Sequence, residues 1–253
     1  MTGAPLEQKQ GTGRQQIRRA LLILAVLSMP VTFLYISFIV ILTGAAQGVA
    51  SASMVLFAGI FLVSLVAGRA WCGWLCPGGG WSDICGTIRN QPVGGGRWDL
   101  LKYGVFVLWA GLLVLLIAQA GGLHGVEIFY NIQNGISFSS VQVLIPYFLV
   151  MGGLFLLVTV VGKRAFCRYA CPWGVLQIIG RKIGNLARLP ALNLTAESTR
   201  CTDCKKCSKE CPMGLDVNGM VKKREMESPD CILCASCADI CPKGAITYGV
   251  KGR

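Results

Sequence analysis

Charged side chains and histidine are scarce in this chain, and several familiar catalytic motifs are missing. Only 14% of its 253 residues are charged, and His124 is its single histidine. The chain contains no P-loop, dinucleotide-binding fingerprint, Ser-His-Asp set or C-x-x-C-H haem motif. These absences indicate that any substrate chemistry belongs to a partner protein.

Cysteine, in contrast, is abundant, and eight of the thirteen cysteines form two runs near the C-terminal end. The first run is Cys201, Cys204, Cys207 and Cys211; the second is Cys231, Cys234, Cys237 and Cys241. Each has the spacing C-x2-C-x2-C-x3-C-P, which is typical of two-cluster bacterial ferredoxins. Zinc sites usually combine two separated cysteine pairs, so the pattern favours two 4Fe–4S clusters over zinc.

In ferredoxins with this spacing, the fourth cysteine of each run ligates the cluster of the other run. We therefore expect cluster 1 to be held by Cys201, Cys204, Cys207 and Cys241. Cluster 2 is then expected to be held by Cys231, Cys234, Cys237 and Cys211.

Four apolar runs without Lys, Arg, Asp or Glu predict transmembrane helices at residues 20–42, 49–67, 103–120 and 141–161. The expected fold is an all-α membrane protein with four transmembrane helices arranged as two parallel hairpin repeats, plus a small α+β two-cluster ferredoxin-like domain. The predicted domains are a basic cytoplasmic tail (1–19), a four-helix membrane domain with an interfacial helix (20–188), and a linker with the ferredoxin domain (189–253).

The formal charge of +12 is distributed unevenly along the chain. All 24 Lys and Arg residues precede the first apolar run, lie between the second and third, or follow the fourth. Under the positive-inside rule this predicts a multi-pass protein of the cytoplasmic (inner) membrane with both termini in the cytoplasm. The basic residues are thereby explained by the lipid bilayer, without a nucleic-acid partner. All the cysteines then face a reducing compartment, where ligated or redox-active thiols are favoured over disulfides.

A repeat of 95 residues carries four further cysteines. Residues 69–77 (RAWCGWLCP) match residues 164–172 (RAFCRYACP), so Cys72 and Cys76 correspond to Cys167 and Cys171. Thiols four residues apart share one face of a helix, and two such pairs supply four ligands. We expect an additional metal centre or redox dithiols there; the alternative is that they are small buried residues. Cys85 has no counterpart in the second copy and is expected to be a spare thiol.

The order of these motifs resembles that of the membrane-bound quinol dehydrogenase components of the NapH, NosR and MauN type. The resemblance covers residues 20–250 and implies electron transfer between the quinone pool and a partner redox protein or reductase through cytoplasmic 4Fe–4S clusters. The NosR branch has a large external flavin-binding domain, which we do not expect in this protein. His124 and Glu127 are candidates for a quinol or proton site, because they are the sole histidine of the chain and the sole acid outside the predicted cytoplasmic regions. In a helical loop they would lie on one side together with Tyr130.

Two other functional classes remain open from the sequence. An assembly or maturation factor that delivers electrons or a metal such as copper to another membrane enzyme would also use soft thiolate ligands. A redox-sensing regulator lacks support, because no receiver, DNA-binding or nucleotide motif occurs in the chain.

Overall fold

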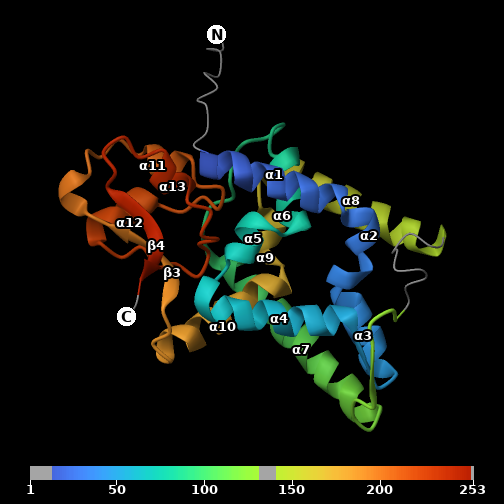
Figure 1. Cartoon of the computed structure of the whole chain (residues 1–253). Helices are drawn as coiled ribbons and strands as arrows, with labels where there is room; N and C mark the ends of the chain where they lie inside the picture. The colour runs from blue at the N-terminus through green and yellow to red at the C-terminus, as the bar shows by residue number, and fades with distance from the viewer. Residues whose placement is uncertain (1–12, 131–140, 252–253) are drawn as a thin grey trace.

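The computed structural model describes residues 13–130 and 141–251, which form a helical body joined to a smaller cysteine-rich part (Figure 1). Residues 1–12 of the predicted tail and residues 131–140 of the predicted second external loop lie outside this range. The body contains α1 (Gly13–Leu27), α2 (Met29–Thr32), α3 (Phe38–Ala46), α4 (Ala52–Ala67), α5 (Ala70–Trp74), α6 (Pro77–Cys85), α7 (Leu101–Gln119), α8 (Val141–Val160), α9 (Ala165–Tyr169) and α10 (Pro172–Leu186). Short 3-10 helices at Leu34–Ile36 and Arg97–Leu100 and a parallel strand pair, β1 (Val49–Ser51) with β2 (Gly125–Glu127), complete it.

The two sequence repeats interlock in the body. Each repeat contributes a long helix, a one-turn helix and a second helix, namely α4, α5 and α6 in the first copy and α8, α9 and α10 in the second. The long helix α4 packs against α10 of the other copy, and α8 packs against α6. Neither repeat therefore forms a separate unit.

Glycines allow the closest of these helix contacts. A Cβ atom on Gly184 of α10 would lie 2.0 Å from the carbonyl oxygen of Leu65 in α4, and one on Gly180 would lie 1.9 Å from Ser64 Oγ. Any larger residue would force α4 and α10 apart. Near the start of α10, Trp173 packs on Phe57 of α4, whose ring also stacks on Trp109 of α7.

The prediction of four transmembrane helices is wrong. Of the described residues, only the helical segment Arg97–Gln119 is long and apolar enough to cross a membrane, and it contains the run predicted at 103–120. The run at 20–42 is divided among four short helices, because Pro30 begins a new helix and Ser37 caps the next by accepting a hydrogen bond from Val40 N.

The run at 49–67 is shortened for a local reason. Its first three residues pair with β2, which leaves 16 residues for α4, or about 24 Å of helix. This falls below the length that about 30 Å of hydrocarbon requires. The fourth run forms α8, which has Pro146 near its start.

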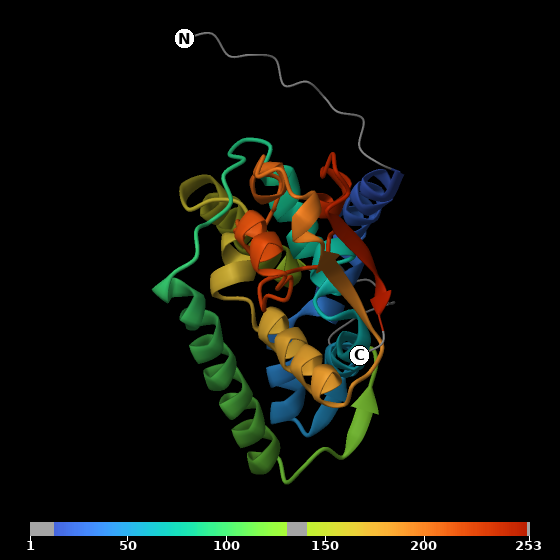
Figure 2. The same ribbon diagram turned by 90° about the vertical axis from the view of Figure 1, so that its left-hand side faces the viewer.

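The helical body nevertheless exposes much apolar surface. Leu108 and Val107 of α7 are 76% and 68% exposed, and Phe148 and Leu149 of α8 are 65% and 70% exposed. Figure 2 shows α7 extending along one edge of the molecule, away from the cysteine-rich part. Apolar patches of this kind mark membrane or protein contacts.

The cysteine-rich part contains the helices α11 (Lys206–Lys209), α12 (Val217–Lys223) and α13 (Ser236–Asp239), a 3-10 helix at Ser198–Arg200, and the strands β3 (Ala191–Ala196) and β4 (Ile246–Lys251). The strands pair antiparallel from Ala191 opposite Lys251 to Ala196 opposite Ile246. Residues 191–196, predicted as linker, are thus part of the fold. Likewise, residues 13–19 of the predicted tail form the first turns of α1, where Gln15 and Arg18 are buried.

Candidate functional site

The two cysteine runs have matching backbones. In each run, the residues on either side of the second cysteine adopt left-handed conformations: Asp203 and Lys205 (φ 56° and 54°) around Cys204, and Leu233 and Ala235 (φ 50° and 61°) around Cys234. A left-handed residue other than glycine costs about 1 kcal/mol or more. Because the same unfavourable pattern recurs in both runs, the shape of the loop must require it. Each loop curves around a central space.

Each loop surrounds a small cavity, and the cavities mix cysteines from both runs. The first cavity is lined by Cys201, Cys204, Cys207 and Cys241. The second is lined by Cys231, Cys234, Cys237 and Cys211. Each therefore receives three thiols from one run and the fourth thiol from the other. These donor sets suit a 4Fe–4S cluster, whose ligands are cysteine thiolates.

Burial raises the pKa of several of these thiols. It raises the pKa of Cys231 to about 12, against weaker opposition from a Leu233 backbone hydrogen bond. It also raises the pKa of Cys237, reinforced by the charges of the other three thiols of its cavity. Cys204 is exposed, and a hydrogen bond from the Lys206 backbone lowers its pKa. Binding iron requires thiolates, so iron would replace the protons of the buried thiols.

The C-x3-C-P pairs lie at helix breaks. Cys72 and Cys167 belong to α5 and α9, whereas Cys76 and Cys171 are extended residues immediately before α6 and α10. The cause is the following proline, which excludes the preceding residue from helical geometry and favours a helix start. The expectation that each pair shares a face of one helix is therefore not met.

The four thiols are nevertheless brought together at the centre of the body. Burial raises the pKa of Cys76 to about 12, and the charges of Cys72 and Cys167 add to the effect. The pKa of Cys171 rises by burial and by the charges of the other three thiols. Over residues 13–130 and 141–251, no three Cys, His, Asp or Glu side chains converge closely enough to hold one metal ion.

The arginine of each repeat reaches across to the cysteine of the other. Arg164 donates to the carbonyl oxygen of Cys72 at 2.8 Å, and Arg69 donates to that of Cys167 at 3.2 Å. Gly79 and Gly174, also 95 residues apart, leave room for these side chains. A Cβ atom on either glycine would lie within 2.8 Å of a guanidinium nitrogen of Arg164 or Arg69.

Buried cations outnumber buried carboxylates around this centre. Two carboxylates receive five cations: Asp83 pairs with Arg18, Lys163 and Arg164, and Asp230 with Arg69 and Lys102. All seven side chains are at most 19% exposed, so three positive charges lack a buried carboxylate. Burying uncompensated charge is costly, which favours an additional negative group at the site.

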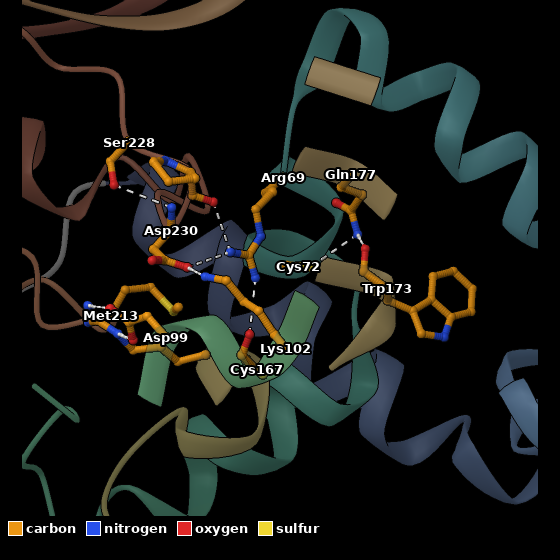
Figure 3. A network of polar contacts seen from close by, with 12 residues as sticks. Arg69, Cys72, Asp99, Lys102, Cys167, Trp173, Gln177, Met213, Ser228 and Asp230 are labelled. Carbon is orange, nitrogen blue, oxygen red and sulfur yellow. Dashed lines mark hydrogen bonds and ion pairs between the residues drawn. The ribbon is translucent and has the colours of Figure 1, made fainter. Parts of the chain in front are cut away.

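The cysteine-rich part docks directly on the first C-x3-C-P loop. Arg69 donates to Asp230 and the Pro229 carbonyl, while Lys102 donates to the same Asp230 oxygen (Figure 3). Trp74 Nε1 donates to the Leu233 carbonyl at 3.0 Å. A Cβ atom on Gly73 would lie 2.3 Å from the Ile232 carbonyl oxygen. Cys72 therefore belongs to the same buried cluster as the second cysteine cavity.

Comparisons with known proteins agree with this arrangement. A family model described as a 4Fe-4S binding domain matches residues 49–92 and 144–190, and one described as a 4Fe-4S dicluster domain matches residues 200–246. The chain is a 4Fe–4S ferredoxin-type protein. The methylamine utilization ferredoxin-type protein MauN of Methylorubrum extorquens is 30% identical to this ferredoxin-type protein over 72% of the chain and 61% of MauN.

Other relatives of this ferredoxin-type protein are more distant or longer. YccM of Escherichia coli is 27% identical over 74% of the chain and 53% of its own length. The nitrogen fixation protein FixG of Rhizobium meliloti is 25% identical over 63% of the chain and 35% of FixG. The chain thus spans about half the length of the relatives it matches. No solved structure matches it.

The proposed quinol residues lie far from both cysteine centres. His124 and Glu127 are exposed, and Glu127 ends β2 instead of following His124 on a helix. His124 Nε2 lies 3.0 Å from the Ala120 carbonyl oxygen. In both whole-molecule views β2 lies at the opposite end from α11 and α13. Cys85 is buried at the end of α6 and lines neither cysteine cavity.

Several residues of this ferredoxin-type site escaped sequence reasoning. Gln177 is fully buried, and its side-chain Nε2 donates to Cys72 Sγ at 3.1 Å. Its side-chain Oε1 has no hydrogen-bond partner among the described residues. Asp83 and Asp230 neutralise part of the buried charge. Of the site residues that the sequence analysis missed, only Gly79 and Gly174 could have been found from the sequence. They match across the 95-residue repeat, two positions after its prolines.

Proposed function

We propose that this protein passes electrons between the quinone pool and a partner redox protein through two 4Fe–4S clusters, while attached to a membrane by the apolar surface of α7 and its neighbours. The observation that carries the proposal is the pair of cavities, each lined by three cysteines of one run and the fourth of the other. In this proposal those two sets are the cluster ligands. The clusters supply one-electron transfer, and the chain supplies their ligands, burial and spacing.

The C-x3-C-P thiols extend the proposed path into the helical body. Cys72 packs in the same buried cluster as the second cysteine cavity, next to Ile232. Five buried cations around two carboxylates favour an anionic group there, and four thiolates bound to iron would provide one. The match of a 4Fe-4S binding model over both repeats supports a further iron–sulfur centre at Cys72, Cys76, Cys167 and Cys171.

Paired cysteine variants test the cross-run ligand sets. Wild-type protein purified without oxygen should hold about eight irons in the ferredoxin part, plus those of any third centre. Replacing Cys201 and Cys241 together by alanine removes ligands from one proposed cluster and should cost about four irons. Replacing Cys201 and Cys211 removes one ligand from each and should cost about eight. Cys85→Ala is the matched control and should lose none.

The opposite ranking of the two double variants would contradict the cross-run assignment. For the third centre, a Cys76→Ala, Cys171→Ala double variant should lose only the iron in excess of eight. The quinone link is tested by adding duroquinol to the protein in liposomes and recording cluster reduction optically and by electron paramagnetic resonance. Clusters that stay oxidised at every quinol concentration and pH would rule out the quinone pool as donor.

A further inference from the structure

A cavity of about 860 Å³ lies between the cysteine-rich part and the helical body. One wall comes from β3 and residues 224–229, and the other from α10. Gly68, Arg69 and Tyr103 complete its lining. Cys231 lines both this cavity and the second cysteine cavity, as do Leu194 and Met226. A molecule bound here would therefore share a wall with the proposed second cluster.

The cavity is lined by more cations than carboxylates. Arg69, Arg181, Lys182 and Arg224 line it, against Glu225 and Glu227. Glu227 lies 3.6 Å from Arg181, so the remaining charge on the lining is positive. Arg69 is 97% buried, and its Nε has no hydrogen-bond partner among the described residues, although its terminal nitrogens bind Asp230, Pro229 and Cys167. These features suit an anionic ligand, since guanidinium groups recognise phosphate and carboxylate.

The rest of the lining suits a flat apolar ring. Ile178, Leu194, Met226, Pro229 and Leu233 contribute apolar surface, and Tyr103 contributes an aromatic ring. Small-molecule sites commonly combine such walls with a few charged groups in a volume of about 300 to 1,000 Å³. The ring would lie on the side of Cys231, with the anionic group towards the basic residues of α10.

We propose that this cavity binds a redox-active organic phosphate of the flavin mononucleotide class, which exchanges electrons with the second cluster. The proposal rests on the proposed function, because it gives the cluster at Cys231 a small-molecule partner. In the donor direction, a fully reduced flavin gives one electron to each of two oxidised clusters and releases two protons to solvent. The oxidised flavin remains as product.

Flavin binding to the purified iron-loaded full-length protein tests the proposal through quenching of flavin fluorescence. Flavin mononucleotide should bind saturably, and riboflavin, which lacks the phosphate, should bind at least tenfold more weakly. Lys182→Gln should weaken binding of flavin mononucleotide at least fivefold, whereas Lys182→Arg should retain it. Lys223→Gln is the matched control, because this exposed lysine adjoins Arg224 in sequence but does not line the cavity; it should leave binding unchanged.

Absence of saturable binding up to about 1 mM, or equal binding of riboflavin, would overturn the proposal. So would equal losses in the Lys182→Gln and Lys223→Gln variants. Displacement of the flavin phosphate by phosphatidylglycerol, with no flavin binding once lipid is present, would assign the cavity to a lipid headgroup instead. Iron content measured on the same samples separates the two proposals: full iron without flavin binding refutes this one alone, whereas missing iron refutes the proposed function.

Discussion

Replacing Asp83 by asparagine should destabilise the helical body more than any exposed charge change. Asp83 Oδ2 lies 2.7 Å from both Arg18 Nη2 and Arg164 Nη2, and its Oδ1 lies 3.0 Å from Arg164 Nε. The Arg164 side chain is fully buried. Asparagine would retain the shape of aspartate but would leave two guanidinium groups without their shared counter-charge.

The expected loss is about 3 kcal/mol of unfolding free energy, because breaking one side of a buried ion pair leaves the other charge uncompensated. Burial disfavours the carboxylate, but Arg164, Lys163 and Arg18 outweigh burial and lower the pKa of Asp83 to about 2. A depressed carboxyl pKa stabilises the fold above the unfolded pKa of about 4, and this contribution is lost as pH falls towards 2. The difference in unfolding free energy between wild type and Asp83→Asn should therefore decrease by about 1 kcal/mol when the pH falls from 7 to 3.

Urea unfolding followed by circular dichroism at 222 nm measures both effects. Glu197→Gln is the control, since Glu197 pairs with Arg200 at 2.7 Å with both side chains more than half exposed. It should change stability by less than about 1 kcal/mol at neutral pH. If Asp83→Asn and Glu197→Gln behave alike at pH 7, or if the gap widens on acidification, the reasoning about the buried charges is wrong.

Three further predictions concern docking and the membrane. Gly73→Val should separate the first C-x3-C-P loop from Ile232 and lower the unfolding free energy, measured in urea, by about 2 kcal/mol or more. The control Gly59→Val has open space around it and should lower the unfolding free energy by less than about 1 kcal/mol. Equal effects would contradict the close contact. Trp74→Phe should lose about 1 kcal/mol with its hydrogen bond to Leu233, and an unchanged unfolding midpoint would show that this bond contributes nothing. Leu108→Asp on α7 should reduce the fraction of protein that floats with liposomes in a sucrose gradient. Val250→Asp, at an exposed apolar site on β4, should not reduce it. Equal flotation of wild type and both variants would argue against attachment through α7.

Sequence reasoning worked best where chemistry is local. The spacing within each cysteine run led to the two thiol sets that the structure gathers around separate cavities, and the 4Fe–4S class is confirmed by the family comparison. The 95-residue repeat led to the meeting of Cys72, Cys76, Cys167 and Cys171. The first result follows from covalent proximity, which limits how far apart ligands in a short loop can lie. The second follows from the internal repeat, because its two pairs are 95 residues apart.

The transmembrane prediction failed because hydropathy ignores backbone interruptions. Pro30 and Ser37 divide one apolar run, and the pairing of Val49–Ser51 with β2 shortens another. The buried ion network was equally hidden, since Asp230 meets Lys102 across 128 positions in sequence. Such partners depend on how the repeats and the cysteine-rich part dock, and no periodicity in a single sequence encodes that docking.

The crossed arginines impose an order on synthesis. Arg69 needs the carbonyl of Cys167 and the carboxylate of Asp230, which leave the ribosome 98 and 161 residues after it. Until then its guanidinium group has neither partner, and the first cysteine loop lacks the surface on which it rests. The four C-x3-C-P thiols can therefore reach the surroundings described above only after nearly the whole chain has emerged.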